Sequence, residues 1–195
     1  MSRRMKVLDT EYRGVSCYDV VKRGIKFNLQ KDAKANLEIF KLPSYTNMFH
    51  EIGHLIDHAM KANISYYSVI YRNSAFSDIL MKETEECIKS TSKRLGISIS
   101  EAEKVISKEI STLSDAQQHD ISDIFSGATK NRVSGRWKHE TDYWTGGAEL
   151  PRETFANMFQ AIINNPESLA QIKKYFPQSY SMFEEMINEY IEGIK

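Results

Sequence analysis

The sequence predicts an α+β fold that is mostly helical and carries a small β-sheet near its N-terminus. The segment Gly24–Leu29 alternates apolar and polar residues, which is the period of a half-buried strand. From about residue 46 onward, apolar residues recur at helical spacing, and serine, glycine and proline stand where helices would begin or end. We therefore expect a short run of strands followed by helices.

The elements are expected in the following order. Residues 1–13 are polar and basic and are expected to form a flexible lead-in to a single domain over residues 14–195. Residues 14–29 suggest a hairpin or small sheet, and residues 30–43 a connection. Helices are expected at about residues 46–62, 74–95, 99–113, 115–126 and 150–164, and two shorter ones start at Pro166 and Pro177.

Composition excludes several classes of protein. The 26 Lys and Arg residues balance the 26 Asp and Glu residues, so no general nucleic-acid partner is expected. Two cysteines, Cys17 and Cys87, do not make a disulfide framework. No apolar run approaches the roughly 20 residues of a membrane span, and no signal peptide follows the basic start. We expect a cytoplasmic protein without a membrane partner.

The segment His50–His54, with the sequence His-Glu-Ile-Gly-His, carries the strongest chemical signal. Positions i and i+4 share one face of a helix, so His50 and His54 can both turn a ring nitrogen toward one Zn²⁺ ion. Glu51 between them could take a proton from a water molecule held there. The alternative is an ordinary helix with two histidines. Three of the five histidines gather at residues 50–58 among apolar neighbours, which favours the metal site.

A third metal ligand has to come from elsewhere. His58 lies about 12 Å along the helix axis from His50, too far to share one ion. The downstream acids Glu149 and Glu153 are better candidates, and Glu153 stands beside the apolar face of the helix expected at about residues 150–164. Glu153 could also be a first-turn acid that favours the helix dipole. Asp57 could orient a ligand histidine or lie at the surface.

The stretch 127–149 shows little periodicity and contains two tryptophans. Loops of this length without secondary structure of their own are usually functional or disordered, and the aromatic content favours a functional loop. His139 and Tyr143 lie in it, just before the Glu153 helix, and either could stabilise the oxyanion of a hydrolytic reaction. A packed tyrosine and an exposed histidine are the alternatives, and the spacing does not decide between them.

The segment Phe49–Asp57 resembles the active-site helix of the anthrax-lethal-factor-like zincins, and Glu153–Ala156 matches the Glu-x-Phe-Ala pattern of their third ligand. The chain is also similar to the metallopeptidase-like domain of phage and prophage minor head (head morphogenesis) proteins. Three further segments match it: Gly24–Leu29, Asp123–Gly127 and Gly135–Trp144. The matches span about residues 24 to 160.

This resemblance implies a zincin-like fold with zinc held by His50, His54 and Glu153. It also implies that Glu51 is the general base and that Tyr143, in preference to His139, is the oxyanion donor. Two features depart from the lethal-factor group: Tyr143 stands further from the ligand glutamate, and Asn157 occupies a position where an acid often follows.

Three functions are consistent with these residues. The first is a zinc metalloendopeptidase that hydrolyses a peptide or protein substrate, including phage structural proteins. The second is a zinc-stabilised structural or interaction module of a phage head protein without turnover. The third is a toxin-type effector protease. The protein would act in the host cytoplasm or on the virion, and the sequence leaves its substrate open.

Overall fold

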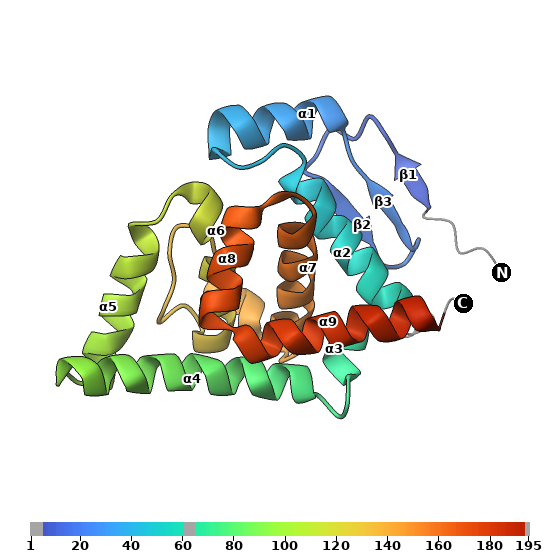
Figure 1. Cartoon of the computed structure of the whole chain (residues 1–195). Coiled ribbons are helices and arrows are strands. Elements are labelled where there is room, and N and C mark those ends of the chain that lie inside the picture. The colour runs from blue at the N-terminus through green and yellow to red at the C-terminus, as the bar shows by residue number, and fades with distance from the viewer. Residues whose placement is uncertain (1–5, 61–64, 194–195) are drawn as a thin grey trace.

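Three short strands near the N-terminus form a mixed sheet that leans against a helical body (Figure 1). The structure is a computed structural model that describes residues 6–60 and 65–193. The strands are β1 (Val7–Asp9), β2 (Cys17–Asp19) and β3 (Gly24–Lys26), in the spatial order β1-β3-β2. Strand β3 pairs in parallel with β1 and antiparallel with β2. The predicted class, α+β and mostly helical with a small N-terminal sheet, is confirmed.

The helices follow the sheet and make up most of the described chain. They are α1 (Leu29–Lys34), the π-helical segment η1 (Ala35–Phe40), α2 (Thr46–Met60), α3 (Tyr67–Ile70), α4 (Ala75–Leu95), α5 (Ile99–Ser111), α6 (Asp115–Thr129), the 3-10 segment η2 (Thr141–Thr145), α7 (Glu149–Asn164), α8 (Pro166–Tyr175) and α9 (Pro177–Glu192). The helices expected from periodicity are all present, with ends within a few residues of the predicted ones. The expected last residues of the α2 helix, 61 and 62, lie outside the described part of the chain.

Local chemistry explains why several helix ends were predictable. Gly96 ends α4 in the left-handed conformation, at φ 66°. Ser98 and Ser114 begin α5 and α6, each with a reciprocal capping box. Pro166 and Pro177 each occupy the first turn of their helix.

Two segments differ from the prediction. Residues 7–9 belong to the predicted lead-in but form β1, because the backbone N–H of Ile25 donates to the Lys6 carbonyl and that of Phe27 to the Asp9 carbonyl. Gly24 permits this approach, since a Cβ there would lie 2.7 Å from the Lys6 carbonyl oxygen. Parallel pairing of this kind joins distant residues and leaves little trace in local periodicity.

The predicted connection over residues 30–43 is also wrong, since α1 and η1 occupy most of it. The side chain of Asn28 caps α1 by accepting a hydrogen bond from the Lys31 N–H, 3.0 Å away. The Ser16 hydroxyl donates to the buried carboxylate of Asp32 and so ties α1 to the segment before β2. These hydrogen bonds stabilise α1 although the helical pattern of its sequence is weak.

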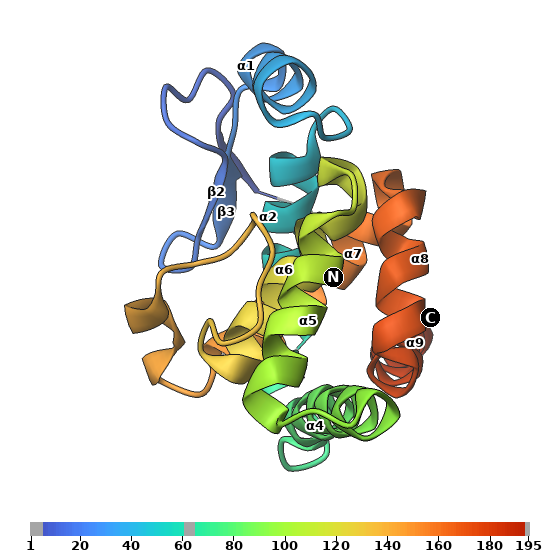
Figure 2. The same ribbon diagram turned by 90° about the vertical axis from the view of Figure 1, so that its left-hand side faces the viewer.

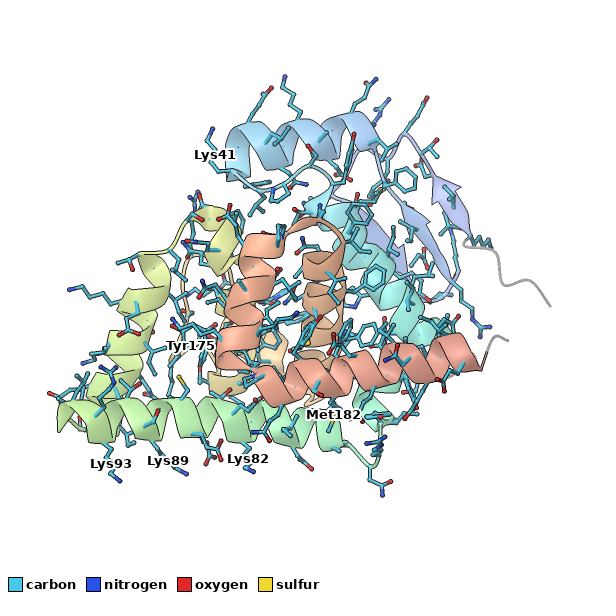
Figure 3. All side chains as sticks on the ribbon, in the orientation of Figure 1. Lys41, Lys82, Lys89, Lys93, Tyr175 and Met182 are labelled. Carbon is cyan, nitrogen blue, oxygen red and sulfur yellow. The ribbon has the colours of Figure 1, made fainter. Side chains whose placement is uncertain are left out.

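The core lies where α7 and α8 meet α4, α6 and α9 (Figures 1 and 2). Its largest fully buried side chains include Phe76, Phe125, Phe155, Phe176 and Phe183. In Figure 3 the side chains of Lys82, Lys89 and Lys93 point away from the body, so the outer face of α4 is polar. None of the helices in residues 6–60 and 65–193 combines the length and hydrophobicity needed to cross a membrane.

Helices α2 and α7 cross closely in the middle of the molecule (Figure 1). Gly53 of α2 lies against Ala156 of α7, and a Cβ at residue 53 would lie 2.7 Å from the Ala156 Cα atom. Because backbone cannot yield as a flexible side chain can, this glycine sets the separation of the two helices. The crossing brings His50 and His54 of α2 next to Glu153 of α7.

Replacing Gly53 with alanine is expected to lower the free energy of unfolding by about 1–3 kcal/mol, because the added methyl group forces the two helices apart. Urea denaturation measures this effect. Gly193→Ala is the matched control: its added Cβ would lie 3.4 Å or more from other atoms, and its φ is −71°. Equal effects of the two substitutions would show that the close crossing does not limit stability.

Candidate metal centre

His50, His54 and Glu153 converge at the crossing of α2 and α7. The Nε2 atoms of His50 and His54 lie 3.1 Å and 3.2 Å from the same carboxylate oxygen, Oε2 of Glu153. One ligand atom from each residue lies within 4.8 Å of the other two. Glu153 is in the second turn of α7, which starts at Glu149, so its carboxylate faces α2 rather than capping its own helix. The predicted trio is therefore brought together.

The trio is largely removed from solvent. His54 is 7% exposed and Glu153 is 3% exposed. Burial alone would raise the pKa of Glu153, but the two imidazoles outweigh it and hold this pKa well below its usual range. Burial alone would lower the pKa of His50, but its hydrogen bond to Glu153 and the charge of that carboxylate raise the pKa to about 9. The site therefore holds an anionic carboxylate between the ring nitrogens of the two histidines.

The donor set fits a divalent metal ion. Atoms that bind one tetrahedral zinc ion at about 2.1 Å lie roughly 3.4 Å apart, close to the two nitrogen–oxygen distances found here. Two imidazoles and one carboxylate also match the ligand chemistry of zinc. One feature differs from most zinc sites: Nδ1 of His54 is buried and has no hydrogen-bond partner among residues 6–60 and 65–193. Asp57 instead accepts hydrogen bonds from the backbone N–H and hydroxyl of Ser68, at 2.7 Å and 2.5 Å.

Glu51 lies at the edge of this centre and is held by the sheet. Its Oε2 atom accepts a hydrogen bond from the backbone N–H of Tyr18 in β2, at 2.7 Å. Its Oε1 atom makes no hydrogen bond with the residues that the structure describes. His58, one turn beyond His54, has its Nδ1 atom 2.7 Å from the Tyr18 hydroxyl and is not part of the metal-binding group. The sheet thus supports the helix face that carries the motif.

The segment between α6 and α7 is held mainly by contacts with α6. Trp144 anchors it, because its ring is buried against Gly127 and its Nε1 donates to the Ser126 hydroxyl at 3.1 Å. The Asn131 side-chain amide donates to the His139 carbonyl at 3.1 Å. The predicted long loop is therefore shorter and more ordered than expected: α6 extends to residue 129 and η2 occupies part of the rest.

Tyr143 and His139 both lie beside the trio. The Tyr143 hydroxyl donates to Oε1 of Glu153 and accepts from Nη2 of Arg152 at 2.6 Å. The His139 ring stacks on the Tyr143 ring at 4.1 Å between centroids, and its Nδ1 lies 2.9 Å from Oδ1 of Asp123. Burial acts to lower the pKa of His139, but Asp123 outweighs it and the pKa is raised. Both side chains are placed at the site, and their catalytic roles stay predictions.

Two clefts open on the centre and share His50, Glu51 and His139. We call the first, of about 290 Å³, the tyrosine cleft; it is lined by Tyr18, Val20, His50, Glu51, His54, Tyr66, His139, Tyr143, Arg152 and Glu153. We call the second, of about 250 Å³, the tryptophan cleft; it is lined by Val15, Asn47, His50, Glu51, His119, Asp123, Trp137, Lys138, His139 and Asn157. The shared residues place the candidate centre where the two clefts meet.

Four side chains at the site were not assigned a role from the sequence: Tyr18, Tyr66, Asp123 and Arg152. Tyr18 and Tyr66 come from a strand and from the start of α3, and no local motif links them to α2. Asp123 stands out in the sequence only as the first residue of the segment Asp123–Gly127. Arg152 directly precedes Glu153, so an adjacent charged pair was the signal that could have drawn attention to it.

The fold and site define a mostly helical α+β protein with a possible His–His–Glu metal centre. Comparison with known protein families, with curated proteins and with solved structures finds no match. The functional argument therefore rests on the geometry of the site and on the sequence motifs.

Metal affinity is expected to rise with pH up to about pH 9. The pKa of His50 is raised to about 9, so this imidazole carries a proton at pH 7 that a metal ion has to displace. Lower pH favours the proton and weakens binding, by about tenfold per pH unit between pH 7 and 8. Zinc titration calorimetry at pH 7, in buffers of different ionisation enthalpy, should show about one proton released per ion. Binding without proton release would contradict this expectation.

Proposed function

We propose that this protein is a zinc-dependent metallopeptidase of the zincin type. The observation that carries the proposal is the placement of Glu51 on the same helix as His50 and His54, with Glu153 completing the trio where two clefts meet. Three protein ligands are the number that catalytic zinc sites use, since they leave a coordination position open. A structural zinc site would more commonly be closed by four protein ligands.

Zinc suits this donor set better than calcium or magnesium does. Imidazole nitrogen favours zinc, copper, iron and nickel, whereas calcium and magnesium prefer oxygen donors. When bound, zinc supplies Lewis-acid chemistry: it polarises a carbonyl group and lowers the pKa of a coordinated water toward about 7. His50, His54 and Glu153 would hold it.

Glu51 is the residue that would accept and return a proton. The Tyr18 N–H fixes one carboxylate oxygen at 2.7 Å and leaves the other without a described partner. A carboxylate held on one side and free on the other can take a proton without losing its position. Glu51 also lines both clefts, so a bound chain would pass directly beside it.

His139 and Tyr143 would meet the negative charge that develops on the scissile carbonyl group. Asp123 bonds to Nδ1 of His139, so Nε2 is the nitrogen left to face a substrate. The raised pKa of His139 favours the protonated ring, which donates from both nitrogens. Tyr143 donates its single O–H to Glu153 here, so it would have to turn this hydroxyl toward the substrate, whereas Nε2 of His139 has no such competing acceptor in the part of the chain that the structure describes. Preorganised donors of this kind stabilise an oxyanion.

A peptide suits the site as substrate because the two clefts meet at His50, Glu51 and His139. An extended chain could enter one cleft and leave by the other, with its scissile bond beside Glu51. The link to phage head proteins rests on the sequence resemblance. On the basis of this resemblance, the proposal includes phage structural proteins as substrates. It also includes action in the host cytoplasm or on the virion.

Metal analysis paired with a peptide-cleavage screen tests the proposed function. We expect one zinc ion per chain in protein purified without chelator, cleavage of some library peptides, and loss of cleavage after chelation that returns with zinc. Bound zinc with no cleavage of any peptide would instead support a zinc-stabilised structural or interaction module. Burial of the trio at the α2–α7 crossing is the observation that favours this second function.

A further inference from the structure

Arg152 lies half-buried in the tyrosine cleft, beside the metal-binding trio. Its Nε and Nη2 atoms lie 3.3 Å and 3.2 Å from Oε1 of Glu153, and Nη2 donates to the Tyr143 hydroxyl at 2.6 Å. Its third nitrogen, Nη1, makes no hydrogen bond with any residue in the described ranges. An arginine has five N–H donors in a planar fork, so both donors of Nη1 are available to a ligand.

Two tyrosine rings flank this guanidinium group. Its central carbon lies 5.3 Å from the centroid of the Tyr66 ring and 5.9 Å from that of the Tyr143 ring. The rings favour the cation, and the Arg152 side chain is only 24% exposed. A charged group with little water around it interacts more strongly with an incoming anion than the same group at the open surface. This environment suits a recognition site better than a surface ion pair.

The balance of charge in the tyrosine cleft also favours an anion. With a divalent ion bound, the two carboxylates of the cleft, Glu51 and Glu153, offset the charge of the metal. The positive charge of Arg152 then remains without a full counter-charge. Glu153 directs Oε2 at the histidines and Oε1 at Arg152, so its single negative charge is shared between the metal ion and the guanidinium group. Asp57 is close enough to affect Arg152, but it is fully buried and bonded to Ser68.

We propose that Arg152 binds a carboxylate of the peptide substrate and makes the site selective for anionic peptides. The two N–H donors of Nη1 can donate to a carboxylate oxygen, and a hydrogen bond from a charged guanidinium group to a carboxylate is shorter and roughly twice as strong as one between neutral groups. Glu153 uses its two oxygens to contact the histidines on one side and Arg152 on the other. The recognised carboxylate therefore belongs to a residue at or next to the scissile bond: either an acidic side chain or the chain's own C-terminal carboxylate.

This inference rests on the proposed peptide-binding function but is tested without turnover. The protein used is the zinc-loaded Glu51→Gln variant, which binds peptides without cleaving them. The probes are alanine hexapeptide amides with one glutamate at successive positions, the matching glutamine peptides, and the all-alanine hexapeptide as free acid and as amide. We expect one glutamate position, or the free acid, to bind roughly ten- to hundredfold more tightly than its neutral match. The position that responds identifies the source of the carboxylate.

Adding Arg152→Gln to this variant is expected to abolish the preference for the acid and leave binding of the neutral peptides within a few fold. Arg152→Lys should keep part of the preference, since it retains the charge but not the planar arrangement of N–H donors. Arg132→Gln is the matched control, because Arg132 pairs with Glu103 at the surface, and it should keep the whole preference. Zinc content and melting temperature are measured for each variant.

Three results would overturn the inference. They are equal binding of acidic and neutral peptides by the parent variant, a preference that survives Arg152→Gln, and a preference lost equally in Arg132→Gln. Failure of the proposed function is a separate result, read from wild-type protein that cleaves none of the peptides. An acid preference that depends on Arg152 would then still establish the anion-binding subsite.

Discussion

Replacing Glu51 with glutamine is expected to lower kcat/KM for peptide cleavage by about 10²- to 10⁴-fold, the contribution typical of a general base. Glutamine has the shape of glutamate and keeps an oxygen that can accept the Tyr18 N–H bond, so the contact between α2 and β2 should survive. What is lost is the ability to take a proton. Zinc content should not change, since Glu51 is outside the ligand group.

The measurement is steady-state kinetics on a peptide found in the cleavage screen, with zinc quantified in the same samples. Glu140→Gln is a suitable control, because Glu140 is an exposed acid in the same loop as His139. It should cleave at the wild-type rate. A Glu51→Gln protein that retains both zinc and full activity would exclude Glu51 as the base and remove the main chemical support for the proposed function.

The part of the site that was predictable from the sequence is the part that depends on local geometry. His50 and His54 are one helical turn apart, and helix periodicity alone places them on one face. Glu153 is 103 residues from His50, yet its position on an apolar helix face and the Glu-x-Phe-Ala pattern singled it out. The structure confirms that these three residues converge.

The parts that were missed depend on contacts between segments far apart in the chain. Strand β1 forms through parallel pairing with β3, and such pairing leaves no periodic signal in three residues. Asp123 of α6 contacts His139 in the loop that follows, and the Tyr18 N–H donates to Glu51 across 33 residues. These contacts are decided by how the sheet and the loop between α6 and α7 lie against α2, which local patterns do not encode.

Zinc is expected to raise the free energy of unfolding of the wild-type protein by about 4 kcal/mol when its free concentration is about 1,000 times the dissociation constant. For a chain of this length, that corresponds to a rise in melting temperature of roughly 8–16 °C. The reason is that the ligands come from two helices, so the ion binds only when α2 and α7 are packed together. Thermal unfolding of chelator-treated protein, with and without added zinc, measures the shift.

Glu153→Gln should lose most of this zinc-dependent shift, because a neutral amide is a much weaker zinc ligand than a carboxylate and leaves a buried cation without its counter-charge. Glu149→Gln is the matched control. Glu149 lies one helical turn earlier on α7, was the other acid favoured by spacing, and is not in the ligand group. The control should keep the full shift. If the shift disappears in Glu149→Gln and persists in Glu153→Gln, then Glu149 and not Glu153 is the third ligand. If both variants keep the shift, then zinc binding does not depend on either acid of α7.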